Sequence, residues 1–308
     1  VADDYMRLRL GWTVAQAVLT CVLVTVLGVP AAWVLARMDF AGRRTVLRLL
    51  MLPFVMPTLV AGMGVLALFG AHGMLAAGWQ DTPWLLIYGN VFFNLPVLVR
   101  SAYQGFVRVP QARLLSAQSL GADAWRRFVW VEWPVVRAWV AGGACLVFLY
   151  CFSGFGLALL LGGERFATVE VEIYRLVAYE LDMARASVLV WLVLAVTAAA
   201  GGLYAYWSKR VAVDKSVSPL PPRAPIWAWE KWLTATVLAM LAVCCLLPLA
   251  AVWLKAAAAG SSWAVLLEAQ TWAAVWNTIR FSAAAVAAAT VLGVLYAAAA
   301  RQMAWLRA

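Results

Sequence analysis

The sequence has a single histidine, His72, and only 14 acidic residues among 308, so it offers few side chains for metal binding or acid–base chemistry. One histidine excludes a haem site with two histidine ligands from this chain, and it leaves no His-rich metal site. No glycine-rich phosphate loop followed by Lys and Ser or Thr is present. We therefore expect no catalytic residue, no metal site and no cofactor bound by this chain. The five cysteines lie in apolar segments without metal-site spacing and are interpreted as small core residues: Cys21, Cys145, Cys151, Cys244 and Cys245.

Apolar residues, in contrast, are abundant. The chain is 66% hydrophobic and 12% charged, whereas a soluble domain is about half apolar and about a quarter charged. Apolar runs of about 20 residues, the length that crosses a bilayer core, recur along the chain. They predict an all-α, polytopic transmembrane helical bundle, preceded by a loop over residues 1–10. The seven expected spans are 12–36, 46–70, 84–104, 136–161, 184–207, 232–254 and 276–299.

The net charge of +10 raises the question of a nucleic-acid partner. If the segments after spans one, three, five and seven are cytoplasmic, 17 of the 24 Lys and Arg residues lie on that side. This is the positive-inside bias of membrane proteins, so the charge indicates topology and a lipid bilayer, not nucleic acid. One outer loop is acidic, and we leave open whether it docks a substrate-binding protein or is merely solvated: Glu164, Glu170, Glu172, Glu180 and Asp182.

A short internal repeat bears on the domain organisation. The sequence TVLGV at Thr25–Val29 recurs at Thr290–Val294, and Thr13 matches Thr278 at the same offset of 265 residues. Transporters are often built from repeated halves. We expect a first half at 1–207 with five spans, lacking an initial span, and a polar, Pro-rich cytoplasmic linker at 208–230. A truncated second half with two spans would then occupy 231–308, making the chain a fragment of a longer protein.

The most informative segment is Val109–Arg137, a polar, arginine-rich island between apolar runs. Pro110 can begin a helix that Gly121 ends, because glycine adopts the left-handed conformation of a helix stop. Asp123 can cap a second helix over 124–133, and Pro134 marks where the chain turns into the next span. The segment predicts two short helices along the inner face of the membrane, which we call the elbow. The small side chains of Ser116 and Ala117 make the first helix of the elbow thin. Three arginines can pair with acidic residues of a partner or with anionic lipid: Arg113, Arg126 and Arg127.

The elbow resembles the cytoplasmic loop EAA-x3-G-x9-I-x-L-P of binding-protein-dependent ABC importer permeases. Here Leu115-Ser116-Ala117 is followed at the same spacing by Gly121 and then by Val131-Glu132-Trp133-Pro134. Leu115 replaces the glutamate, so an ion pair at that position cannot form. In that family the loop is a coupling helix that sits in a cleft of the ATPase subunit. The resemblance implies the same role for residues 111–134 in a type I importer permease: Leu115, Ser116, Ala117, Gly121, Asp123, Arg126, Arg127 and Pro134.

Further segments, including Gly89–Phe106, Leu149–Gly163 and Ala167–Ser187, look most like thiamine-importer permeases, with ferric-iron permeases next. Both are typically fused double permeases. The resemblance implies a multi-pass protein of the bacterial inner membrane that moves a small solute, thiamine favoured and ferric iron the alternative, from a periplasmic binding protein into the cytoplasm. The partners implied are that binding protein and an ATPase subunit, expected as a dimer, which would hold ATP and Mg.

Polar residues inside spans often line a transport pathway. Pro96 frees a backbone carbonyl, and the nearby asparagines can hydrogen-bond locally. The sequence around Ser153 opens the backbone and offers aromatic faces for a cation, although small residues for helix packing explain it equally well. The candidates for the pathway are Asn90, Asn94, Pro96, Ser153 and Phe155.

Other classes of function remain as alternatives. A membrane-embedded enzyme would need acids, histidines or a metal set inside the spans. A passive channel or a secondary carrier would not need the elbow, and a carrier would be expected to have buried ion-coupling residues. No Asp, Glu or Lys lies in the middle of an expected span, which favours the ATP-driven permease.

Overall fold

The computed structural model describes residues 2–75, 78–80, 82–209 and 220–302, and within them the chain is helical. Those residues contain no strand, and Met38 and Arg223 form an isolated parallel bridge. The elements, in chain order, are α1 (Ala2–Arg37), α2 (Arg43–Leu49), α3 (Leu52–Val55), α4 (Thr58–Phe69), α5 (Pro83–Val107), α6 (Gln111–Ser119), α7 (Ala124–Arg127), the π-helical turn η1 (Phe128–Glu132), α8 (Trp133–Phe152), α9 (Phe155–Leu161), α10 (Val169–Arg175), the π-helical turn η2 (Leu176–Glu180), α11 (Met183–Lys209), α12 (Ala228–Leu241), the π-helical turn η3 (Ala242–Leu246), α13 (Leu247–Ala257), the 3-10 helix η4 (Gly260–Leu267) and α14 (Ala269–Gln302).

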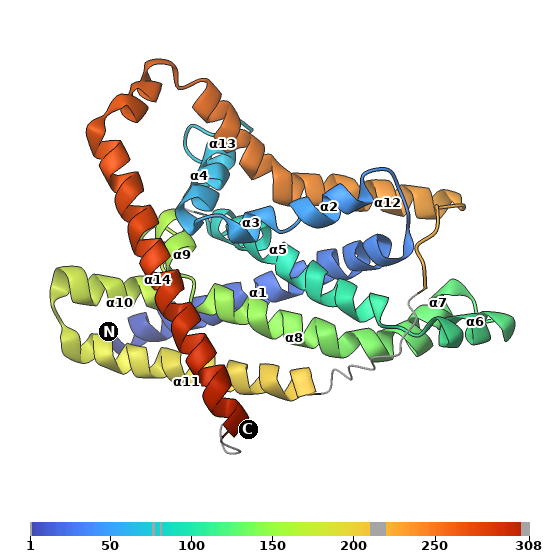
Figure 1. The fold of residues 1–308 in the computed structure, drawn as a ribbon. Helices are drawn as coiled ribbons and strands as arrows, with labels where there is room; N and C mark the ends of the chain where they lie inside the picture. Colours follow the sequence, from blue (N-terminus) through green and yellow to red (C-terminus); the bar gives the residue numbers. More distant parts are fainter. Residues whose placement is uncertain (1, 76–77, 81, 210–219, 303–308) are drawn as a thin grey trace. The chain divides into compact units, whose positions relative to one another are not determined.

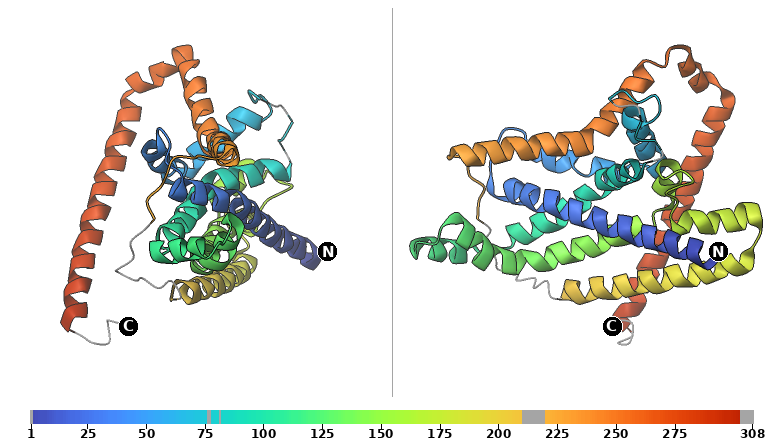
Figure 2. Two further views of the ribbon diagram at one scale, coloured as in Figure 1. Left: turned by 90° about the vertical axis from the view of Figure 1, so that its right-hand side faces the viewer. Right: turned by 180° about the vertical axis from the view of Figure 1, so that it is seen from behind.

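The chain forms two compact units, Val1–Leu254 and Lys255–Ala308. In the first unit, α1, α5 and α8 pack against one another, and α11 covers α8 (Figures 1 and 2). Their shared core includes Ala17, Leu95 and Phe106, none of which is exposed. α5 and α8 approach closely at Ser101, whose hydroxyl donates to the Trp139 carbonyl at 2.7 Å. Small side chains and interhelical hydrogen bonds of this kind hold helices together where no water is present.

The all-α, polytopic class predicted from the sequence is confirmed. Among the described residues, six helices are long and apolar enough to cross a membrane, and a seventh span results if the bent pair α2–α4 counts as one. The six segments are Asp4–Arg37, Pro83–Val107, Ala124–Phe152, Met183–Lys209, Ala228–Ala257 and Ala269–Ala299.

Two of the expected spans are interrupted. The span expected at 46–70 bends by 103° between Val55 and Thr58. The reason is Pro57, which lacks an N–H and keeps the preceding Met56 extended. The span expected at 136–161 ends at Phe152, and α9 begins only at Phe155. Both breaks lie in the first unit, and Pro57 and Ser153 are exposed there.

The loop expected over residues 1–10 is wrong, because α1 begins at Ala2. Long-range contacts explain the extension. Arg9 donates to the carbonyls of Arg165 at 2.8 Å and Glu164 at 2.7 Å, while Tyr5 donates to Glu172 at 3.1 Å. Tertiary packing therefore extends the helix beyond its apolar stretch.

The second unit consists of the end of α13, η4 and α14. The indole N–H of Trp263 donates to the Ala256 carbonyl at 2.9 Å, which closes the turn between α13 and η4. The repeated motif falls in a long helix in each unit, at Thr25–Val29 in α1 and Thr290–Val294 in α14. The expected halves 1–207 and 231–308 do not coincide with the two compact units, because α12 packs in the first unit against α1.

Candidate functional site

The elbow forms two short helices around a glycine. α6 ends at Ser119, and Gly121 follows with φ of +81°. This left-handed backbone suits glycine, and a Cβ added there would touch nothing within 4 Å. The carboxylate of Asp123 accepts the backbone N–H of Arg126 at 2.7 Å, which caps α7 as the sequence predicted. The helix–glycine–helix geometry is therefore present.

The elbow carries exposed apolar side chains. Leu120, at the end of α6, is 87% exposed, and Trp125 in α7 is 71% exposed. Leu115 and Ser116 are exposed on α6, Ala117 is half-buried, and the buried Leu114 anchors the helix to the first unit. An exposed apolar patch flanked by polar residues is typical of a protein-interaction surface.

The two arginines of α7 differ in their surroundings. Arg126 is exposed and lies 3.8 Å from the Asp123 carboxylate. Arg127 is half-buried, and its Nη1 donates to the side-chain oxygen of Gln118 at 3.2 Å. Arg126 is therefore accessible to a partner, whereas Arg127 faces the body of the first unit.

The expected turn at Pro134 is not present. Ala124–Phe152 is one continuous helical segment, in which η1 inserts a π-helical turn just before Trp133. Pro134 lies in the first turn of α8, where a missing N–H is tolerated, and the π-helical turn absorbs the change in hydrogen bonding. The elbow is thus joined rigidly to α8, without a hinge at the proline.

A buried ion pair fixes the elbow to α1, and it was not predicted from the sequence. Arg37 Nε donates to Glu132 Oε1 at 2.8 Å, and both side chains are 6% exposed. The indole of Trp33 donates to the second carboxylate oxygen at 3.0 Å, and Arg37 Nη2 donates to the Phe106 carbonyl at 3.1 Å. One feature of the sequence could have indicated this ion pair. Glu132 stands between Val131 and Trp133, and a carboxylate that is buried among apolar residues without a partner would be costly.

A second ion pair, between Arg223 and Glu230, joins the neighbouring linker segment to α12. The backbone of Arg223 pairs with α1, donating to the Arg37 carbonyl at 3.0 Å and accepting from the Asp39 N–H at 2.8 Å. Its guanidinium binds the buried Glu230 of α12 at 2.6 Å and 3.2 Å. The two ion pairs therefore connect the elbow, the end of α1, the linker and the start of α12. Of the predicted linker 208–230, positions 210–219 lie outside the described residues.

These contacts surround a cavity of about 450 Å³, which we call the inner cavity. Its ionisable side chains are the three arginines and two glutamates Arg37, Arg127, Arg223, Glu132 and Glu230. Arg37 Nη1 is buried without a hydrogen-bond partner.

A second cavity gathers most of the predicted pathway residues. It has a volume of about 210 Å³ and lies where the breaks α3–α4 and α8–α9 meet α5. Asn90, Asn94, Ser153 and Phe155 all line it, together with Thr58 and Tyr150, which sequence reasoning missed. We call it the pathway cavity. Pro96 lies elsewhere, buried in the uninterrupted helix α5.

Buried amides form one wall of the pathway cavity. Asn90 donates to Gln16 of α1 at 2.7 Å, and Gln16 donates to the Cys151 carbonyl at 2.8 Å beside the helix break. Asn94 donates to the Asn90 carbonyl at 2.9 Å, while its own Oδ1 is buried without a partner. Gln16, fully buried, was not singled out from the sequence. The wall is polar but uncharged, and the rings of Phe93, Tyr150 and Phe155 contribute aromatic surface.

The acidic segment between α9 and α11 is folded rather than a loop. Glu172 is buried in α10, and Arg175 lies 3.0 Å from its carboxylate and 3.1 Å from that of Glu180. Half-burial raises the pKa of the Glu170 carboxyl above its ordinary value. Arginines thus compensate part of the acidic charge predicted there.

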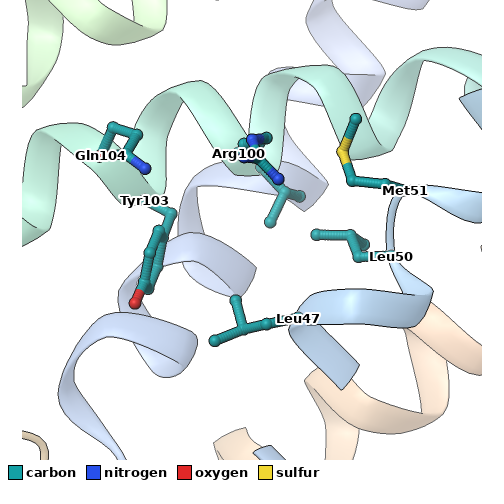
Figure 3. Close-up of a pocket in the computed structure, with 7 residues that line it drawn as sticks. Leu47, Leu50, Met51, Arg100, Tyr103 and Gln104 are labelled. Carbon is teal, nitrogen blue, oxygen red and sulfur yellow. The ribbon is translucent and has the colours of Figure 1, made fainter. Parts of the chain in front are cut away.

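A smaller pocket of about 140 Å³ lies between α2 and α5 (Figure 3). Leu47, Leu50 and Met51 face Arg100, Tyr103 and Gln104 across it. Arg43 of α2 donates to the Tyr103 hydroxyl at 3.4 Å and to the Leu35 carbonyl at 2.8 Å. The pocket lies between the first part of the bent helix pair and α5. Among the described residues, no group of three or more His, Cys, Asp or Glu side chains is arranged to hold a metal ion.

Comparison with known proteins identifies the family of the chain. Residues 25–213 match the family described as "Binding-protein-dependent transport system inner membrane component". The chain is 32% identical over 294 residues to the thiamine transport system permease protein ThiP of Salmonella typhimurium and 31% identical to that of Escherichia coli, covering 92% of this chain and 55% of each relative. A molybdenum transport system permease protein, ModB of Azotobacter vinelandii, is 32% identical over 182 residues, or 56% of this chain and 80% of the relative.

Solved structures agree on the fold. A crystal structure of an amino acid ABC transporter with histidines aligns with a TM-score of 0.52 at 12% identity, covering 68% of this chain and 96% of that one. A transporter that imports the polysaccharide alginate aligns with a TM-score of 0.50 at 15% identity, covering 65% and 78%. The chain spans about half the length of the thiamine permeases it matches. It belongs to the binding-protein-dependent transport system inner membrane components, the multi-pass permeases of ABC importers in the inner membrane.

Proposed function

We propose that this chain is part of an ATP-driven permease that moves thiamine from a periplasmic binding protein into the cytoplasm. A separate ATPase, expected as a dimer, would bind ATP and Mg and dock on the elbow. The observation that carries the coupling role is the exposure of the apolar side chains Leu120 and Trp125 on an elbow that the buried Arg37–Glu132 pair supports. A movement of these exposed side chains would be transmitted to α1 and α8 through the Arg37–Glu132 pair.

Thiamine is favoured because the relatives covering 92% of the chain are thiamine permeases. The pathway cavity supports the same choice over ferric iron. Its wall has aromatic rings and amides and no carboxylate among its lining residues. Aromatic faces attract an organic cation, whereas hard metal cations prefer several carboxylate or carbonyl oxygens. Asn90, Asn94, Ser153 and Phe155 are the residues we propose to contact the cargo.

We propose the same domain organisation as from the sequence: a first permease half at 1–207, a cytoplasmic linker at 208–230 and the start of a second half at 231–308. The repeated motif in α1 and α14 supports it. The ion pair between Arg223 and Glu230 would then tie the linker to the first helix of the second half.

The deciding experiment is ATPase activity of the complete permease, assembled with its ATPase in bilayer discs. Binding protein loaded with thiamine should stimulate ATP hydrolysis, and binding protein loaded with ferric iron should not. Stimulation by the iron-loaded form alone would reverse the cargo assignment. Uptake that proceeds without the ATPase would instead indicate a passive channel or a secondary carrier.

The coupling role is tested by changing Gly121. Valine at φ of +81° costs about 1–2 kcal/mol in backbone strain, whereas asparagine tolerates this conformation. Because no atom lies near the added Cβ, the change acts through the backbone alone. Gly121→Val is expected to abolish stimulated ATPase activity while the protein still inserts, and Gly121→Asn is expected to retain most of it. Equal activity of both variants would refute the coupling role of the elbow.

A further inference from the structure

The inner cavity carries an imbalance of charge that its own residues do not neutralise. Among the described residues, three arginines and two glutamates line it, which leaves one net positive charge. Both glutamates are already satisfied. Glu132 accepts from Arg37 and Trp33, and Glu230 accepts from Arg223 and from the backbone N–H groups of Ile226 and Trp227.

The positive charge that remains has free donors. Arg37 Nη1 is buried and has no hydrogen-bond partner. Arg127 is held only by the neutral amide of Gln118, at 3.2 Å. A buried guanidinium nitrogen without an acceptor is costly, so a bound anion at this place would stabilise the folded protein.

Apart from Gln118, the remaining residues that line the cavity are apolar or aromatic. Met38, Leu114 and Leu220 line it, and the rings of Trp33 and Trp229 stack with centroids 6.2 Å apart. Trp227, also in the wall, is 62% exposed. Tryptophan of this exposure is typical of the membrane–water interface.

We propose that the inner cavity binds the headgroup of an anionic phospholipid from the cytoplasmic leaflet. A phosphodiester carries one negative charge, which matches the net charge of the cavity. Basic pockets between helices on the cytoplasmic side bind such headgroups, and the apolar wall accommodates the start of the acyl chains. The lipid would lie between the elbow and the linker, so it would stabilise their contact. The inference rests on the proposed placement of the elbow at the cytoplasmic face.

The test measures lipid retention without ATP or cargo, so its result is independent of the transport assay. The complete permease is assembled in discs of phosphatidylcholine mixed with phosphatidylglycerol, transferred to mild detergent, and analysed by native mass spectrometry for retained lipid. Wild type is expected to retain phosphatidylglycerol in preference to phosphatidylcholine. Arg127→Gln should lower that retention at least about tenfold, because it removes a charge-assisted hydrogen bond to the headgroup.

Two variants serve as controls. Arg126→Gln removes a neighbouring arginine that does not line the cavity and should retain the lipid. Arg127→Lys keeps the charge and should restore most of the retention. Equal loss in Arg126→Gln and Arg127→Gln would show general attraction to the membrane surface and overturn the proposal. Displacement of the lipid by inorganic phosphate would overturn it in favour of a soluble phosphate ligand, and equal retention of both lipids would overturn it outright.

Discussion

Glu132→Gln is the sharpest test of how the elbow is held. The carboxylate of Glu132 accepts from Arg37 and from Trp33, and both members of the ion pair are 6% exposed. Removing the negative charge leaves the buried Arg37 guanidinium uncompensated. Breaking a buried pair in this way costs about 3–5 kcal/mol. For a domain of about 150–250 residues that corresponds to a fall in melting temperature of roughly 6–20 °C, and the larger complete protein should show a smaller fall.

The assay is thermal unfolding of the purified complete protein in detergent, followed by tryptophan fluorescence. Arg126→Gln is the matched control, because its pair with Asp123 lies in the same segment at 3.8 Å and is exposed. An exposed pair contributes about 0–1 kcal/mol, so this control should melt close to wild type. The double variant Arg37→Met with Glu132→Leu should recover most of the stability, since apolar replacement of a buried pair is often neutral or stabilising.

The reasoning would be refuted if Glu132→Gln melted as wild type does. It would also be refuted if the double variant were less stable than Glu132→Gln, because the loss of the pair itself, rather than the loss of charge balance, would then dominate. A loss of stimulated ATPase activity in Glu132→Gln at a temperature where the protein is folded would additionally place the ion pair in coupling.

Further predictions concern packing and the pathway cavity. Gly64→Ala should lower stability by about 1–3 kcal/mol, because the added Cβ would lie 2.7 Å from the backbone oxygen of Pro248. Gly62→Ala, which meets only the flexible end of Leu160, should cost less, and equal melting temperatures for the two variants would contradict this account. Gln16→Leu should cost about 1–3 kcal/mol by leaving the Asn90 amide without its acceptor, as measured by thermal unfolding. If Gln16→Leu instead melts at the wild-type temperature with unchanged cargo-stimulated ATPase activity, the amide wall is not needed.

Local signals in the sequence were sufficient for the elbow but not for its support. Gly121 and Asp123 act through their own backbone and the residues three positions away, so their structural roles could be predicted from spacing. The prediction for Pro134 was wrong because the effect of a proline depends on the hydrogen bonding of the preceding turn, and the π-helical turn η1 changes that bonding. Nothing in the spacing of Arg37 and Glu132, 95 residues apart, indicates that they pair.

The pathway candidates likewise separate into residues that local sequence identifies and residues that only tertiary packing reveals. Asn90, Asn94, Ser153 and Phe155 could be identified because polar or small residues are unusual in apolar spans. Gln16 was equally unusual, but its importance follows from the packing of α1 on α5, which no local pattern reports. Pro96 was chosen because it frees a backbone carbonyl, but it lies inside α5 and does not line the pathway cavity.

The backbone bridge between Met38 and Arg223 has a consequence for synthesis of the chain. The carbonyl of Arg37 and the amide of Asp39 find their partners in a residue made 185 positions after Met38. At about 5–20 residues per second, the ribosome needs roughly 10–40 s to reach that residue. During this interval α1 can be inserted while its end is still unpaired. The nascent chain therefore completes the base of α1 only after Arg223 has been made, and an early stop before Arg223 would leave that end open to quality-control proteases.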